Sequence, residues 1–303
     1  MKKRLMTTVA VGAVALLGLS ACATDSGDTG EPTGSSTPTG DKTSLTIGVF
    51  NGWPEGEAAS FLWKHILEGK GYDVTLEYAD AGPVFEGLST GDYDVAFDGW
   101  LPTTHKKYMD AHKGEIVDLG AWNEDAVLTM AVNDDAPITS LSELADHADE
   151  FGNKIIGIEP GAGLTDAVQN KVIPTYGLEG MEFITSSTGA MLAELKAAIK
   201  DDENIVVTLW RPHWAYDEFP IRDLEDPEGT LGSAESIHSL ARTGFEDDYP
   251  QLTEWIKNFK FSSELLFSLE NVMYNGDIDA SEYDGIVSDW MKEHQDYVDS
   301  LTS

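Results

Sequence analysis

Residues 44–79, SLTIGVFNGWPEGEAASFLWKHILEGKGYDVTLEYA, decide how this chain folds. The segment opens with an apolar strand pattern over 44–50 and continues with apolar residues at helical spacing over 57–71. The glycines of GKG indicate where that helix stops, and a second strand pattern follows over 72–79. A strand, a helix and another strand in this order predict a parallel α/β unit.

The same alternation continues along the chain. The further predicted elements are a short helix over 82–91, strands over 93–97 and 154–160, a helix over 188–203 and a strand over 204–210. From about Ser239 the pattern is helical to the C-terminus. This order predicts an α/β fold with mostly parallel sheets flanked by helices. The folded part, roughly 44–303, suffices for one large or two medium domains.

The N-terminal segment differs in composition from the rest. Residues 1–21 combine a basic start, a short apolar stretch and small residues, which is typical of a secretory signal peptide. Cys22, the only cysteine, stands in LSAC where it resembles the lipobox of bacterial lipoproteins. The alternative is an ordinary signal peptide whose cleavage site happens to contain a cysteine. Residues 22–43 are rich in Gly, Ser, Thr, Pro and Asp, and we expect a flexible tether there.

These features predict a protein anchored by lipid at Cys22 to the extracytoplasmic face of the cell membrane. The formal net charge is −35, and loss of Lys2, Lys3 and Arg4 with the signal peptide leaves −38. So negative a chain argues against nucleic acid or an anionic lipid surface as a partner. A single cysteine leaves no pair for a disulfide within the chain.

The sequence carries no catalytic or metal-binding signature. His105 and His112 are seven residues apart, with no acid or third histidine at the spacing of a metal site. A Gly-x-Ser-x-Gly motif and a catalytic cysteine are also missing. We therefore expect a protein that is not an enzyme and that uses no metal and no cofactor.

Three tryptophans follow predicted strands in the same way. Trp53 comes after 44–50, Trp100 after the strand that ends at Phe97, and Trp210 at the end of 204–210, each with a proline one or two residues later. Ligands of open parallel sheets bind beyond the carboxyl ends of the strands. Each ring could instead plug a strand end, but the threefold recurrence favours a binding site.

The other five tryptophans lack this pattern. Three of them, Trp63, Trp255 and Trp290, lie inside helical patterns and are expected to pack in or near the core. Trp122 lacks the proline, and Trp214 could line the site or support it.

A cluster of aromatic faces suits two ligand classes, sugars and quaternary ammonium groups. Sugars also need many polar partners, whereas a quaternary ammonium cannot donate hydrogen bonds and is held by cation–π attraction. Three desolvated rings supply about 3–6 kcal/mol. Micromolar affinity needs about 8 kcal/mol, so a second anchor is expected.

The glycine-rich segment GIEPGAGLTDAV, residues 157–168, is the candidate for that anchor. It is predicted as a strand end, a turn and a helix that opens near Thr165. Free N–H groups at a helix start bind anions. The Gly-Lys-Ser/Thr of a phosphate loop is missing, so a carboxylate is the better candidate, although such glycines also serve simply as tight turns.

Several motifs resemble those of the glycine betaine/proline betaine-binding proteins of ABC importers. They are DGWLPTTHKKY, GIEPGAGL, VVTLWRPHW, LEDPEGTLGSAESIHSLARTGF and DAGPVFEGLSTGDYDV, and the likeness covers nearly all of residues 44–303. The resemblance implies a type II periplasmic-binding-protein-like fold with two lobes that close on a ligand in the cleft between them.

The resemblance also implies roles for individual residues. Trp53, Trp100 and Trp210 match a prism of three tryptophans around the ligand's ammonium group. Its carboxylate is expected to meet the backbone amides of Gly163 and Leu164 and the side chain of His105. His213 also matches a family position, without a ligand role that follows from it.

The sequence departs from the family pattern near two of the tryptophans. Glu55 lies beside Trp53, Leu209 stands where glycine is usual, and Arg211 stands where a small polar residue is usual. We expect Glu55 or Arg211 to retune the choice among compatible solutes.

We therefore expect a solute receptor that passes a quaternary ammonium ligand to an ABC permease. Lobe one is expected over 44–131 and 241–303, and lobe two over 132–240. The alternatives are a receptor for choline, carnitine or a sulfonium analogue, or an extracellular enzyme acting on such a ligand.

Overall fold

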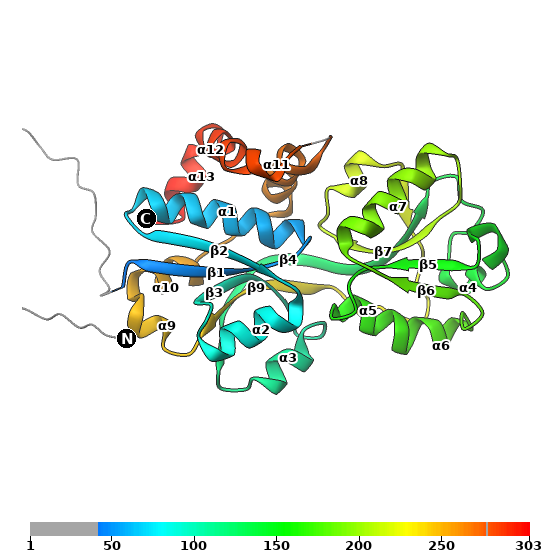
Figure 1. Ribbon diagram of the computed structural model, residues 1–303, viewed down its shortest axis with the longest axis horizontal. Helices are drawn as coiled ribbons and strands as arrows, with labels where there is room; N and C mark the ends of the chain where they lie inside the picture. The colour runs from blue at the N-terminus through cyan, green and yellow to red at the C-terminus, as the bar shows by residue number, and fades with distance from the viewer. Residues whose placement is uncertain (1–41, 277) are drawn as a thin grey trace, which may run out of the picture. The chain divides into compact units, whose positions relative to one another are not determined.

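The computed structural model describes residues 42–276 and 278–303 (Figure 1). The predicted signal peptide, Cys22 and the tether up to residue 41 lie outside the described residues. Nine strands form one mixed sheet in the order β2-β1-β3-β9-β4-β7-β5-β6, with β8 paired to β4. The strands are β1 Ser44–Phe50, β2 Asp73–Ala79, β3 Val95–Leu101, β4 Ile116–Asn133, β5 Lys154–Gly157, β6 Glu182–Thr185, β7 Val206–Arg211, β8 Ile221–Asp223 and β9 Glu235–Arg242.

The helices connect and cover these strands. The α-helices before β7 are α1 Pro54–Gly69, α2 Ala81–Thr90, α3 Lys106–Ala111, α4 Leu141–Leu144, α5 Gly163–Ala167, α6 Ile173–Tyr176 and α7 Thr188–Lys200. Those after β7 are α8 Ala215–Glu218, α9 Phe245–Asp248, α10 Pro250–Lys257, α11 Ser263–Tyr274, α12 Tyr283–Glu293 and α13 Gln295–Ser300. Single turns of other helix types are η1 Ala148–Phe151, η2 Val168–Val172 and η3 Ala280–Glu282. No described helix is both long and apolar enough to span a bilayer.

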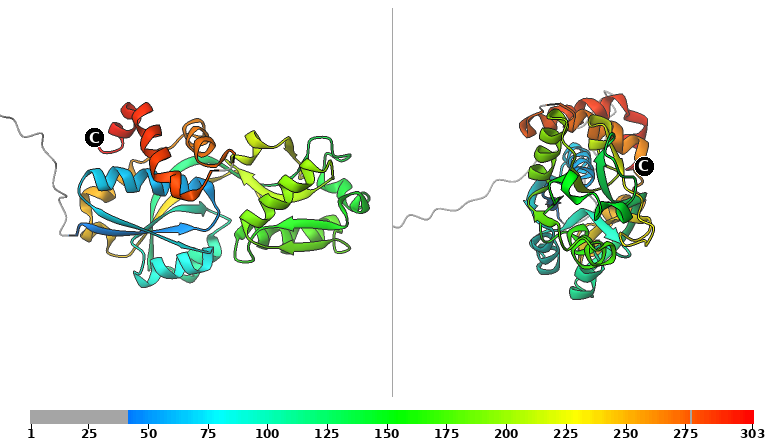
Figure 2. Two further views of the ribbon diagram at one scale, coloured as in Figure 1. Left: turned by 45° about the horizontal axis from the view of Figure 1, so that its top comes forward. Right: turned by 90° about the vertical axis from the view of Figure 1, so that its right-hand side faces the viewer.

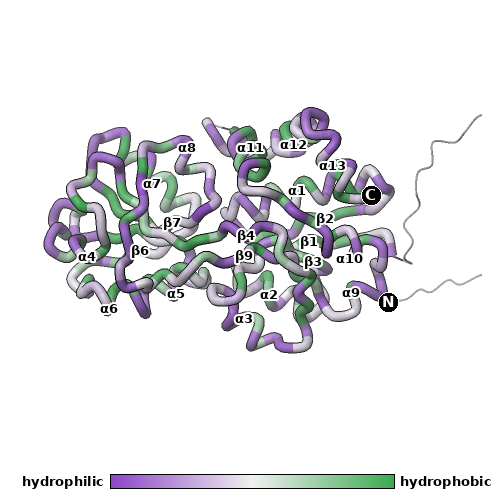
Figure 3. The backbone as a smooth tube through the Cα atoms, turned by 180° about the vertical axis from the view of Figure 1, so that it is seen from behind, coloured by the Kyte–Doolittle hydropathy of each residue, from purple (hydrophilic) through white to green (hydrophobic). Residues whose placement is uncertain are grey.

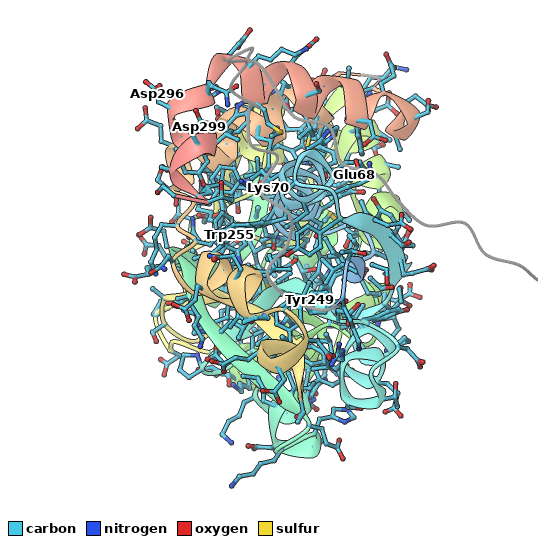
Figure 4. The ribbon with its side chains drawn as sticks, turned by 90° about the vertical axis from the view of Figure 1, so that its left-hand side faces the viewer. Glu68, Lys70, Tyr249, Trp255, Asp296 and Asp299 are labelled. Atoms are coloured by element: carbon cyan, nitrogen blue, oxygen red, sulfur yellow. The ribbon has the colours of Figure 1, made fainter. Side chains whose placement is uncertain are left out.

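The first part of the sheet, β2-β1-β3 with β9 and β4, has helices on both faces. Figure 2 (left) shows strands β1–β3 between α1 on one side and α2 on the other, with the C-terminal helices beyond α1. Figure 3 shows hydrophobic and hydrophilic stretches alternating along these outer helices, as expected when one face of a helix is buried. At the edge of this part, the ammonium group of Lys70 lies 4.9 Å from the ring centre of Trp255 in α10 (Figure 4).

The second part of the sheet is β4-β7-β5-β6. Figure 1 shows α7 on one of its faces and α5 and α6 on the other. The long strand β4 joins the two parts, because it pairs with β9 up to Ala126 and with β7 from Val127 onward.

The α/β prediction is confirmed, and the sheet proves to be mixed rather than mostly parallel. Pairs β1–β2, β1–β3, β5–β6 and β5–β7 are parallel. Strands β4 and β9 run antiparallel to their neighbours. The prediction of helix from Ser239 onward is wrong at its start, because β9 continues to Arg242 and the first helix after it begins at Phe245.

The predicted end of the third strand is also wrong. The structure continues β3 from Val95 to Leu101, with a register shift between Ala96 and Gly99 against β9. A side chain at Gly99 would come within 2.6 Å of a methyl group of Leu240, so the strand passes its neighbour closely at this point. Asp-Gly therefore forms an irregularity inside a strand here, and Trp100 is the last but one residue of β3.

Candidate functional site

A small pocket collects most of the residues that the sequence singles out. Its empty space, part of which is open to solvent, amounts to about 270 Å³. Its lining residues come from both parts of the sheet: Trp53, Glu55, Trp100, Thr104, His105, Leu128, Ile158, Ala162, Gly163, Leu164 and Trp210. All six residues expected to contact ligand are among them. We call Trp53, Trp100 and Trp210 the indole cage.

Trp53 is placed by the turn between β1 and α1. Gly52 adopts a φ of +75°, which turns the chain, and Pro54 opens α1 directly after the tryptophan. The indole stacks on Phe50, with ring centres 4.9 Å apart, and on His105 at 5.4 Å. Its ring centre is 6.4 Å from that of Trp210, with the planes 66° apart.

Trp100 is held by the irregular end of β3. Its indole N–H donates to the Asp98 carboxylate at 2.9 Å, and its backbone N–H donates to Nδ1 of His105 at 2.9 Å. The ring is 3% exposed. The strand therefore fixes both the Trp100 ring and the neighbouring imidazole.

His105 is a neutral hydrogen-bond donor at the pocket. Burial lowers the pKa of His105 to about 3, so the imidazole is uncharged at neutral pH. Because Nδ1 accepts the Trp100 N–H, the ring proton lies on Nε2. The side chain lines the pocket, so Nε2–H can serve an acceptor there.

Trp210 comes from the second part of the sheet, near the end of β7. Its backbone is paired with Leu128 of β4, which also lines the pocket. His213 packs edge-on against the indole, with ring centres 4.8 Å apart and planes 84° apart, and accepts the Ala215 N–H on Nδ1. His213 is thus a support for Trp210 and is not a lining residue.

Gly163 and Leu164 begin α5 and line the pocket. The first amides of a helix have no acceptor within it, so these N–H groups are available to a ligand. A side chain at Gly163 would come within 2.6 Å of the Thr104 carbonyl oxygen. The glycine therefore lets the two pocket walls approach closely.

Three buried acids lie at or behind the pocket, and sequence reasoning recognised only part of this group. Glu55 lines the pocket with one carboxylate oxygen unpartnered, and burial raises the pKa of Glu55 to about 7. Burial also raises the pKa of Asp98 and of Glu270, and the neighbouring Glu55 charge adds to both shifts. Glu55 stood out beside Trp53, whereas Glu270 sits in α11 with no sequence signal to mark it.

The other departures from the family pattern lie away from the pocket. Arg211 donates to Asp223 at 2.8 Å and lies 3.5 Å from the ring centre of Tyr216, so its charge is already engaged. Leu209 is fully buried in β7. Neither lines the pocket, which leaves Glu55 as the departure that can touch a ligand. Among residues 42–276 and 278–303, no group of three or more His, Cys, Asp or Glu side chains is arranged to hold a metal.

Residues 43–293 match the family described as the substrate binding domain of the ABC-type glycine betaine transport system, OpuAC. The chain belongs to this family. Among its curated relatives is a Listeria monocytogenes protein named glycine betaine/carnitine transport binding protein GbuC, 35% identical over 161 residues. That match covers 52% of this chain and 51% of the relative, so the chain spans about half the length of that protein.

Two solved structures of this kind extend the likeness over most of the chain. The glycine betaine/L-proline-binding protein ProX from Borrelia burgdorferi is 32% identical, with a TM-score of 0.79, and the match covers 86% of this chain and 97% of that one. Lactococcal OpuAC, closed and complexed with glycine betaine, is 27% identical, also with a TM-score of 0.79, over 87% of this chain and 100% of that one. The fold is thus that of type II binding proteins.

Proposed function

We propose that this protein is an extracytoplasmic receptor for a quaternary ammonium compatible solute, glycine betaine or proline betaine, and delivers it to an ABC permease. The observation that carries the proposal is the pocket, in which three indoles meet a neutral histidine and two free helix amides. The indole faces suit a cation without hydrogen-bond donors, and the donors of the histidine and the amides suit a carboxylate. The named ligands of the similar proteins support the same assignment.

The protein is proposed as a receptor and not as an enzyme acting on such a ligand. The acid–base candidates in the pocket lining are His105, whose lowered pKa makes it a weak base, and Glu55. In the described part of the chain, the lining holds no Ser, Cys or Lys that could serve beside them as a nucleophile. Mass analysis of glycine betaine after incubation with the protein is expected to show unchanged ligand. A new product would favour the enzyme instead.

The carboxylate end of the ligand is expected to set specificity. Choline shares the ammonium group but carries a hydroxyl, which would leave the donors at Gly163, Leu164 and His105 poorly paired at a cost of about 1.5–3 kcal/mol. We expect glycine betaine or proline betaine to bind at least about tenfold more tightly than choline, as measured by calorimetry. His105→Ala should narrow this gap by weakening betaine. Equal or tighter binding of choline would contradict the assignment.

One observation favours a second candidate, a receptor for choline or another ligand with a net positive charge. Glu55 lines the pocket, is 1% exposed and has an unpartnered carboxylate oxygen, and an ionised acid there would favour a cation over a zwitterion. Carnitine and sulfonium analogues belong in the same binding panel. Loss of choline binding in Glu55→Gln, with betaine binding kept, would identify this function.

We also propose two lobes that close on the ligand, close to the expected division into 44–131 with 241–303 and 132–240. The pairing change in β4 between Ala126 and Val127 lies near the first boundary. Pairing of β9 with β3 and β4 along its length favours placing the second boundary before Glu235. In this division Trp53, Trp100 and His105 belong to one lobe, and Trp210, Gly163 and Leu164 to the other. A ligand that touches both sets favours the closed state.

The proposal includes a lipid anchor at Cys22 after removal of residues 1–21. Cys22→Ser is expected to abolish lipidation and to release the protein from the membrane, while betaine binding is kept, because the pocket lies entirely within residues 53–210. Labelling with a radioactive fatty acid, followed by membrane fractionation, measures both effects. Lipid labelling of Cys22→Ser at the level of the unchanged protein would contradict the anchor.

A further inference from the structure

The Trp53 indole is held by an acid from the other part of the sheet. Its N–H donates to Oε1 of Glu159 at 2.5 Å. Trp53 follows β1, whereas Glu159 follows β5, 106 residues further along the chain. Both side chains are buried, at 5% and 6% exposed. This hydrogen bond therefore joins the first part of the sheet to the second. Trp53 lines the pocket, whereas Glu159 does not.

The second oxygen of Glu159 is fixed by the start of α7. Oε2 accepts the backbone N–H of Thr188 and the Thr188 hydroxyl, each at 3.1 Å. The turn before Trp53 meets the same residue, since a side chain at Gly52 would lie 3.0 Å from Cβ of Thr188. The orientation of the Glu159 carboxylate is thus fixed by Thr188. The turn that carries Trp53 packs directly against the same threonine.

The indole of Trp100, which lies in β3, is held in a different way. Trp100 donates to Asp98, which lies two residues earlier in the same strand. That bond needs nothing from the second part of the sheet. The orientation of Trp53 is in contrast tied to Glu159 and Thr188, which belong to the second part of the sheet and its helices, as do Gly163 and Leu164.

We propose that Glu159 is a positioning residue of the binding site, which holds the Trp53 indole against the ligand through its N–H and so couples this ring to the opposite wall of the pocket. The inference rests on the proposed function, since it assigns a task in the same site. Glu159 contacts the Trp53 ring of the indole cage and not the ligand itself. Without Glu159 the buried indole N–H loses its carboxyl acceptor, and the ring loses the contact that sets its angle.

A double-mutant cycle tests whether Glu159 acts through the indole N–H. Trp53→Phe keeps an aromatic face and removes the N–H donor, so it serves as the matched background. In the otherwise unchanged full chain, Glu159→Ala is expected to weaken glycine betaine binding about tenfold, and Glu159→Gln, which keeps a neutral acceptor, about threefold. In the Trp53→Phe background each change should cost about twofold or less. Calorimetry gives the six affinities, and thermal unfolding checks the fold of each variant.

The outcomes separate this inference from the proposed function. Failure of the unchanged protein to bind any betaine would remove the function itself. If the unchanged protein binds, the inference would be overturned by an equal loss of affinity from Glu159→Ala in the unchanged chain and in the Trp53→Phe background. Glu159 would then act through the fold and not through the indole N–H. Unchanged affinity in Glu159→Ala would overturn it as well. If Glu159→Ala does not fold, the same comparison is made with Glu159→Gln.

Discussion

Trp100→Ala is expected to weaken glycine betaine binding about a hundredfold. A desolvated cation–π contact contributes about 2 kcal/mol or more. Removal of the ring also takes away the apolar surface that Trp100 presents to the ligand's methyl groups. The two losses together exceed the 2.7 kcal/mol or so that corresponds to a hundredfold change in affinity. Trp100→Phe should lose less, because it keeps a weaker aromatic face. Calorimetric titration with glycine betaine measures all these effects.

Trp255→Ala is the matched control for this experiment. Trp255 is half-buried in α10, beneath Lys70, and does not line the pocket. Its removal should cost some stability and leave the affinity unchanged. If Trp53, Trp100 and Trp210 all tolerate alanine with unchanged binding, the indole cage is not the ligand site.

The strand–helix unit at the start of the folded part was predictable because its signals are local. The predicted strand over 44–50 coincides with β1, and the predicted helix over 57–71 overlaps α1, which begins three residues earlier at Pro54. Apolar spacing set the type of each element, and the glycines and Pro54 set the boundaries.

The strands β4 and β9 escaped prediction because their partners are distant in sequence. Strand β9 lies between β3 and β4, so its backbone is satisfied from both sides by segments more than a hundred residues away. Its sequence, ESIHSLAR, mixes polar and apolar residues without a clear strand signal. Strand β4 has three register shifts against β9, which break any regular alternation of buried side chains.

The residues of the site also differ in whether local sequence could predict them. The indole cage was recognisable because each ring lies near or just after the end of a strand and precedes a proline, which is a local pattern. The buried acids were not, since Glu159 and Glu270 gain their importance only from residues far away in sequence. Trp53 gives Glu159 its role, and burial together with the charge of Glu55 gives Glu270 its raised pKa.

The pH dependence of stability is expected to differ strongly between the unchanged protein and Glu55→Gln. Burial raises the pKa of Glu55 from its ordinary value of 4.5 to about 7 in the folded state. Between these values the folded protein keeps a proton that the unfolded chain releases, so stability is lost as the pH rises. The loss is complete above about pH 7 and amounts to about 3 kcal/mol. Glutamine does not titrate, so Glu55→Gln does not undergo this loss of stability.

Glu55→Gln should therefore gain about 3 kcal/mol of unfolding free energy relative to the unchanged protein between pH 4 and pH 8. Burial lowers the pKa of His105 and of His213 to about 3, which costs stability in acid, but both histidines are present in the two proteins and their effect cancels in the difference. Neutralising Glu55 also relieves its repulsion of Asp98 and Glu270, which acts in the same direction. Urea unfolding of the ligand-free proteins across this range measures the difference. Parallel pH profiles would show that Glu55 is ionised in the folded pocket, and would favour a cationic ligand over a zwitterionic one.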